Sequence, residues 1–163
     1  MDANNPATLI ASEYKRICEI GEADSTTLLT LMAVALDNEF QKGLVSMGNV
    51  DITPPAGSLK FIAQSSPSDN ARHIAEQVTS YWLQTITPTG IPQSCDSIVG
   101  VSNDASKIKS PIESNLLSIY NGDILTPSFY HFCDAIIKEV KKITWVVSEA
   151  SSKCATTFTV TIS

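Results

Sequence analysis

Residues 127–150, PSFYHFCDAIIKEVKKITWVVSEA, contain the longest helical pattern in the chain. Their core-type residues recur every three or four positions, which is the spacing of one face of an α-helix. This stripe comprises Phe129, Phe132, Cys133, Ile136, Ile137, Val140, Ile143, Thr144 and Val147. The pattern predicts a helix from Pro127 to about Ala150 and favours a mainly α fold.

Upstream of this stretch, pairs of a helix-capping residue and proline mark where further helices begin. Proline suits the first helical turn, and a preceding Asn, Ser or Thr can accept hydrogen bonds from the free N–H groups there. With the apolar spacing, these signals predict helices over residues 6–20, 24–42, 67–86 and 111–121. The four pairs are Asn5-Pro6, Ser66-Pro67, Ser110-Pro111 and Thr126-Pro127. The chain is therefore expected to be one domain, residues 1–163, with about five helices packed as an irregular bundle.

The last nine residues, ATTFTVTIS (155–163), change from a helical to an alternating pattern. Phe158, Val160 and Ile162 fall on one face, which predicts a C-terminal β-strand with one buried side. The central loops contain two weaker strand patterns, at residues 59–63 and 98–101. A lone strand cannot satisfy its own backbone. We expect the C-terminal strand to pair with one of these short strands, the alternative being a strand of another chain.

Composition limits the classes of partner. The chain has a formal net charge of −6, and its basic residues are spread thinly. Nucleic-acid binding relies on clustered basic residues, so we expect no nucleic-acid partner. The most apolar run, residues 28–36, is shorter than the roughly 20 residues of a membrane span. Residues 1–5 lack the features of a signal peptide, so we expect no membrane association and reduced cysteines.

Catalytic and metal-binding patterns are not apparent. His131 and Cys133 are two positions apart and would not face each other on a helix. The four cysteines are far apart and no histidine lies at a metal-ligand spacing from them. We therefore predict no catalytic residue, no metal, no cofactor and no enzymatic activity. A hydrolase with a site assembled from distant residues is the least favoured alternative.

The second half of the chain has a suggestive order of segments. Tyr81-Trp82 close a helix, residues 88–92 (PTGIP) break it, a possible strand and a short helix follow, and residues 143–149 (ITWVVSE) end a long helix. This arrangement resembles small tail- or capsid-associated structural proteins of phages and prophages. The resemblance implies a non-enzymatic virion component, assembled in the host cytoplasm, that contacts copies of itself and other virion proteins. A cytoplasmic helical binding or adaptor module is the alternative.

Several residues are candidates for such contacts, and a homo-oligomer is expected. The strand residues Phe158, Val160 and Ile162 rank first. Trp145 and Tyr130 lie off the main stripe of their predicted helix, which indicates either exposed interface aromatics or a helix buried on several sides. The proline-rich loop supplies the remaining candidates, Thr87, Pro88, Ile91 and Pro92.

Overall fold

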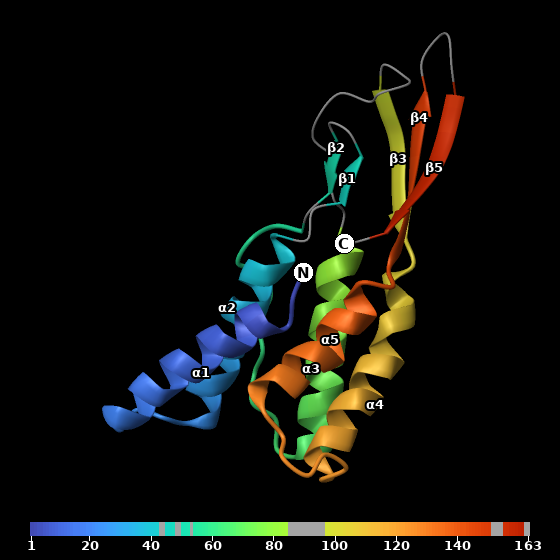
Figure 1. Ribbon diagram of the computed structural model, residues 1–163. Helices are drawn as coiled ribbons and strands as arrows, with labels where there is room; N and C mark the ends of the chain where they lie inside the picture. The colour runs from blue at the N-terminus through green and yellow to red at the C-terminus, as the bar shows by residue number, and fades with distance from the viewer. Residues whose placement is uncertain (43–44, 48–49, 53, 85–96, 151–154, 162–163) are drawn as a thin grey trace.

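The protein consists of a helical body from which a β-sheet projects (Figure 1). The computed structural model describes residues 1–42, 45–47, 50–52, 54–84, 97–150 and 155–161. The helical body comprises five α-helices and a short 3-10 turn, η1. The mainly α fold with about five helices is confirmed. The helices are α1 (Asn4–Glu19), α2 (Ser25–Phe40), α3 (Pro67–Leu83), α4 (Lys109–Tyr120) and α5 (Phe129–Val140), with η1 (Ala105–Ile108) before α4.

The pairs of a capping residue and proline predicted where the helices begin, although the residue predicted as the N-cap is the N-cap in only some of them. The Ser66 side chain accepts a hydrogen bond from the Asp69 amide at 3.1 Å, as predicted for α3. The Asp24 side chain caps α2 by accepting from the Thr27 amide. In α1 and α4 the proline lies inside the first turn, and α5 begins after Ser128 rather than Thr126. Proline therefore lies in the first turn of α1, α3 and α4, whereas Pro127 precedes the cap of α5.

The helices pack in a connected series. α1 and α2 form an antiparallel hairpin, α1 also contacts α5, and α4 contacts both α3 and α5. An aromatic cluster closes the end of the body nearest the sheet: Phe40, Tyr81 and Trp82 pack with ring centroids 5.4–5.5 Å apart. Burial of such large apolar surfaces is the main source of stability in a core of this kind.

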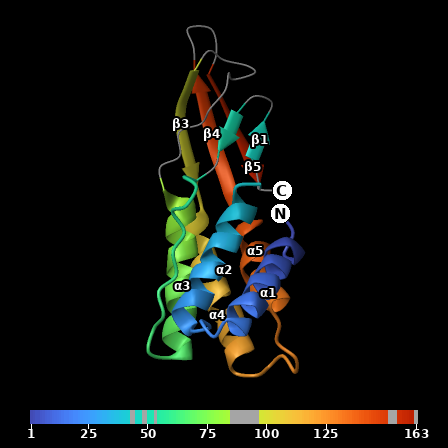
Figure 2. The ribbon, with the colours of Figure 1, turned by 90° about the vertical axis from the view of Figure 1, so that its left-hand side faces the viewer.

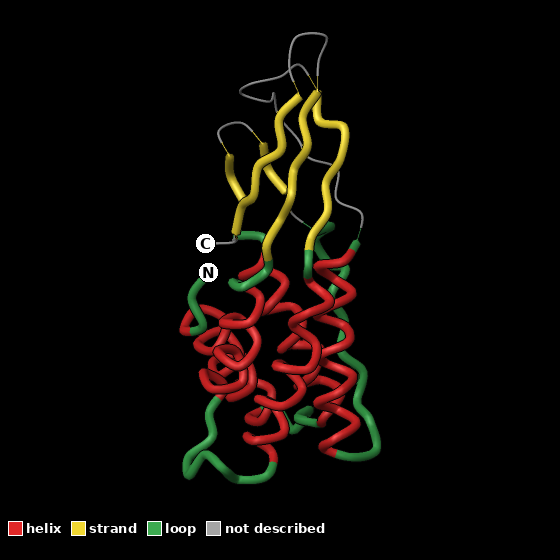
Figure 3. The backbone as a smooth tube through the Cα atoms, turned by 90° about the vertical axis from the view of Figure 1, so that its right-hand side faces the viewer, coloured by secondary structure: helices red, strands yellow, loops and turns green. Residues whose placement is uncertain are grey.

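The projecting sheet has three antiparallel strands in the order β3-β4-β5 (Figure 3). We call it the β-arm. Its strands are β3 (Ser97–Asn103), β4 (Thr144–Ala150) and β5 (Ala155–Thr161). The predicted C-terminal strand exists and pairs within its own chain, although its partner is β4. The strand predicted at residues 98–101 is confirmed within β3.

The prediction of one helix from Pro127 to Ala150 was wrong in its second half. α5 ends at Val140, and residues 144–150 form the central strand of the β-arm. Residues 143–147 read ITWVV, which consists of β-branched and aromatic residues that favour strands. Their spacing fits a helix, but pairing with β3 on one side and β5 on the other favours the extended form.

Residues 41–66 differ from the prediction. A short hairpin, β1 (Val45–Met47) and β2 (Val50–Ile52), was not predicted. The strand predicted at residues 59–63 is absent, since this segment has no strand partner. Gly43, which follows the helix predicted over residues 24–42, lies outside the described residues. Viewed from the side, the β1–β2 hairpin lies next to the β-arm, and the helical body lies below both (Figure 2).

Candidate interaction surfaces

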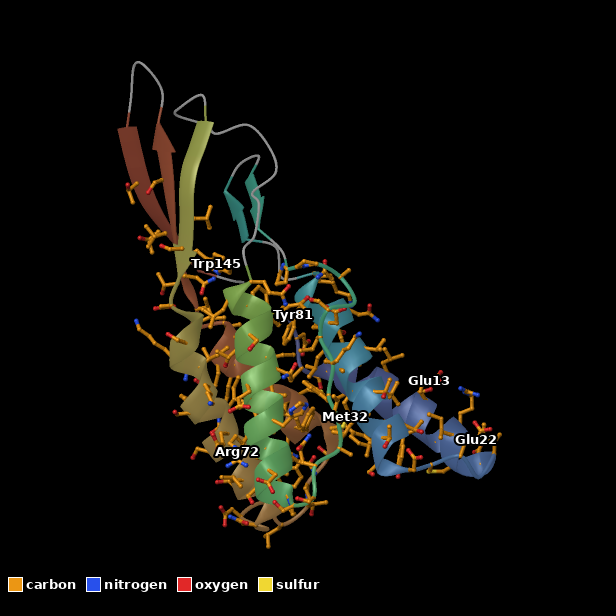
Figure 4. All side chains as sticks on the ribbon, turned by 180° about the vertical axis from the view of Figure 1, so that it is seen from behind. Glu13, Glu22, Met32, Arg72, Tyr81 and Trp145 are labelled. Carbon is orange, nitrogen blue, oxygen red and sulfur yellow. The ribbon has the colours of Figure 1, made fainter. Side chains whose placement is uncertain are left out.

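The root of the β-arm is built into the core of the helical body. Trp145 of β4 is 1% exposed, and its ring lies edge-on to Trp82 of α3 with centroids 6.3 Å apart. Figure 4 shows Trp145 where the arm meets the body, above the helices. The prediction of an exposed interface tryptophan is therefore wrong. Trp145 lies off the helical stripe because its segment is a strand, and strand geometry turns it inward.

Polar contacts reinforce the same junction. The Asp104 carboxylate accepts hydrogen bonds from the Thr144 amide and from Lys107 Nζ, both at 2.7 Å. Burial alone would raise the pKa of Asp104, but these hydrogen bonds and the Lys107 charge outweigh it and lower the pKa. Asn103 Nδ2 donates to the carbonyl of Trp82 at 2.7 Å. The start of β4 and the end of β3 are thus fixed to the body.

Above the root, the two faces of the β-arm differ. The register places Phe158 opposite Val147, and Val160 opposite Trp145, on one face. Thr157 and Thr159 lie on the other face and are exposed. Two of the three leading interface candidates therefore share a face, as the alternating sequence predicted. The third, Ile162, lies outside the described residues.

The remaining interface candidates do not join this surface. Tyr130 is 41% exposed, but it lies in the first turn of α5, at the end of that helix remote from the β-arm (Figure 1). Thr87, Pro88, Ile91 and Pro92 lie outside the described residues. The described part of the chain therefore does not bring Tyr130 together with Phe158 and Val160.

The residues considered for catalysis are engaged in the fold. Cys133 is buried in the core, and burial, with the negative charge of Glu39, raises the pKa of its thiol to about 12. A thiol with such a pKa stays protonated near neutral pH and is a poor nucleophile. His131 hydrogen-bonds to Ser128 at 2.9 Å, and His73 Nε2 accepts the Ile62 amide hydrogen at 3.0 Å. Among the described residues, no three His, Cys, Asp or Glu side chains are grouped to hold a metal ion.

A buried polar cluster holds the chain that follows the β1–β2 hairpin against the helices. The Asp37 carboxylate accepts hydrogen bonds from Tyr81 Oη at 2.5 Å and from the Gly57 amide. Gln41 Nε2 donates to both Tyr81 Oη and the Pro54 carbonyl at 2.8 Å. Burial, together with the hydrogen bond to Asp37, raises the pKa of Tyr81. The cluster fixes residues 54–57 and so positions the extended segment that follows them.

Two apolar grooves were not predicted, because each is assembled from segments distant in sequence. The first, which we call the α2 groove, has a volume of about 380 Å³ and lies between α2 and residues 57–62. The second, which we call the end groove, has a volume of about 580 Å³ and lies between α2, α4 and α5. Leu125, in the loop between α4 and α5, is 99% exposed. Exposed Val34 in α2 is the one sequence signal for the α2 groove, since it broadens the apolar stripe beyond the core face.

No family model matches the chain, and comparisons with curated proteins and with solved structures find no match. None of the helices in the described ranges has the length and apolar character required to cross a membrane.

Proposed function

We propose that this protein is a non-enzymatic structural subunit that assembles through its β-arm, as a component of a phage-type virion. The observation that carries this proposal is the β-arm itself, a sheet that projects from the body with β3 and β5 as its outer strands. Outer strands present unpaired backbone groups to which another chain can add. The kind of particle is taken from the sequence resemblance to phage structural proteins, although residues 143–149, which that resemblance places at the end of a long helix, lie almost entirely in strand β4.

The composition of β5 supports this role. Soluble proteins usually prevent an outer strand from pairing with another chain by means of lysine, proline, a bulge or a covering segment. The β5 sequence, ATTFTVT, has neither charge nor proline and is rich in β-branched residues. Such a strand favours pairing with a neighbour, and a chain of net charge −6 would do so best through an uncharged surface. The expected partners are copies of the same chain and other virion proteins, rather than nucleic acid.

The test is the solution mass of the full chain across a concentration series, measured by light scattering. Thr159→Lys places a charge on the outer strand at an exposed position, and we expect at least a tenfold weaker association. Ser148→Lys is the matched control, because Ser148 lies on the same face of the central strand. A wild-type protein that stays monomeric at high concentration would refute the proposal, as would equal association of the two variants.

A helical binding module remains the second candidate, favoured by the end groove. Its walls are mostly apolar, and Tyr120 at its edge is exposed. An apolar groove between helices suits the apolar face of a partner helix. A monomeric wild-type protein, with binding to a partner helix that Leu28→Asp abolishes, would favour this candidate over assembly through the β-arm.

A further inference from the structure

Residues 58–64, which connect the polar cluster to α3, have the side-chain alternation of a strand but no strand partner in the described parts of the chain. Leu59 and Phe61 are buried, whereas Lys60 is exposed and Ile62 is 64% exposed. The segment passes α2 and α3 on the surface of the body (Figure 2). We call it the extended segment. It is the same stretch in which the sequence predicted a strand.

One edge of the extended segment is already used. The Ile62 amide donates to His73 Nε2 at 3.0 Å, and the Gln64 amide donates to Asn70 Oδ1 at 2.8 Å. Both acceptors are on α3. In an extended backbone, successive residues direct their N–H and C=O groups to opposite sides. Leu59, Phe61 and Ala63 therefore direct theirs away from α3, and no hydrogen bond among the described residues engages them.

The α2 groove lies beside this unpaired edge. Its α2 wall includes Thr26, Thr30 and Ala33, which are small enough to let another backbone approach closely. Val34, 50% exposed, adds apolar surface to the same wall. A groove with unpaired amides and carbonyls along one side suits an extended chain, because only an extended chain presents matching groups at the same interval. A helix would leave those groups without partners.

We propose that the extended segment of one copy accepts the outer edge of strand β5 from a second copy. This inference rests on the proposed function and identifies the surface that the β-arm binds. β5 is uncharged, and among the described residues it is hydrogen-bonded as a strand to β4 alone, with β1 of the same chain close to it. Of the charged residues that line the α2 groove, Asp37 is engaged by Tyr81 and Gly57, which leaves Lys60. Two copies of net charge −6 can therefore meet here without burying like charges.

The geometry of this contact also limits its symmetry. The β-arm and the extended segment are different surfaces, so a reciprocal exchange between two copies closes a dimer, whereas a one-way contact generates a larger ring or an open chain.

The test combines a blocking variant with amide hydrogen exchange on the full chain. Thr30→Arg fills the α2 groove from an exposed helical position, and we expect association to weaken at least tenfold. Ser12→Arg, at an exposed position on α1, is the matched control and should associate like the wild type. On assembly of the wild type, exchange at the Phe61 and Ala63 amides should slow at least tenfold. Association unchanged by Thr30→Arg, or unchanged exchange at both amides, would overturn the inference while leaving assembly through the β-arm intact.

A peptide probe separates this inference from the proposed function. The probe is a synthetic peptide of residues 155–163, compared with the same peptide methylated at the four amides of residues 157–160, which blocks both backbone edges. We expect the unmodified peptide to bind the wild type and neither the methylated peptide nor the Thr30→Arg variant to show binding. If the full chain stays monomeric, the proposed function fails, and this titration still decides the inference: equal binding of the two peptides, or none, refutes it.

Discussion

The helical body and the β-arm differ in how their backbone groups are satisfied. In the body, each helix pairs its own backbone locally, and packing of apolar faces into one core joins the helices. In the β-arm, every pairing is between strands, and the two outer strands retain one unpaired edge each among the described residues. The arm shares the core of the body at its root through Trp145, and the β1–β2 hairpin lies next to β5. Trp145 thus lies where the helices, which satisfy their own backbone hydrogen bonds, meet the strands, which depend on neighbouring strands for theirs.

The largest expected effect on stability comes from removing the Trp145 side chain, which joins the β-arm to the body. Trp145→Ala should destabilise the protein by about 3–5 kcal/mol, since it leaves a cavity beside Trp82 that the core cannot fully close. Urea denaturation followed by far-UV circular dichroism measures the loss. Leu125→Ala, at a fully exposed position, should change the free energy of unfolding by less than about 0.5 kcal/mol. Similar losses in the two variants would show that the arm is not built into the core.

A smaller loss is expected at the polar part of the root. Asp104→Ala should cost about 2 kcal/mol, because the Thr144 amide loses a charged acceptor. Amide hydrogen exchange should accelerate at Thr144 more than in α1, which marks the loss as local. The pKa of Asp104 is lowered in the folded protein, so its contribution is present above about pH 3.8 and is lost as the pH falls further. The wild type and the variant should therefore converge in stability in acid.

The thiol of Cys133, in the helical body, should make the free energy of unfolding depend on pH in the alkaline range. Its folded pKa of about 12 exceeds the ordinary value of 9.0, so the unfolded chain ionises first as the pH rises. The stabilisation is fully present below about pH 9 and declines towards pH 12, by roughly 1 kcal/mol between pH 7 and pH 10. Cys133→Ala should be less stable at pH 7 but should lose less stability over this interval. Parallel pH profiles in urea denaturation would contradict the assignment.

The smallest effects distinguish two helix starts that look alike in sequence. Ser66→Ala should cost about 1 kcal/mol, because the hydroxyl accepts from the Asp69 amide at the N-terminus of α3. Thr126→Ala should cost less than about 0.5 kcal/mol, since α5 begins after Ser128 and Thr126 does not cap it. Thermal unfolding of the two variants side by side makes the comparison. Equal losses would mean that Thr126 contributes as a cap after all.

The local signals were sufficient to predict α1 to α4, β5 and part of β3, but not the end of α5 or strand β4. Caps, proline and apolar spacing are read within a few residues, and they located α1 to α4 within three residues at either end. Residues 143–147 satisfy two periods at once: Ile143 and Val147 continue the helical stripe, while Trp145 and Val147 alternate as in a strand. Pairing with β3, some 45 residues away, favours the strand. No single-segment pattern contains that information.

The interaction surfaces also differ in whether they are formed by a single segment or assembled from segments distant in sequence. The alternating C-terminal sequence placed Phe158 and Val160 on one face because a strand's period is visible in a single segment. The α2 groove could not be predicted, since its walls come from α2 and from residues 57–62. The extended segment was a partial exception: its alternation predicted a strand, and what the sequence could not reveal was that no strand of the described chain lies beside it.

The position of the two tryptophans has an optical consequence. The chain has only two, and both are buried at the junction with ring centroids 6.3 Å apart. Among the described residues, neither indole N–H has a hydrogen-bond partner, which indicates an apolar environment for both rings. The intrinsic emission of the whole protein should therefore be blue-shifted and arise from the junction alone. Two rings this close should also couple in the ultraviolet, which makes the protein a natural spectroscopic reporter of the angle between arm and body.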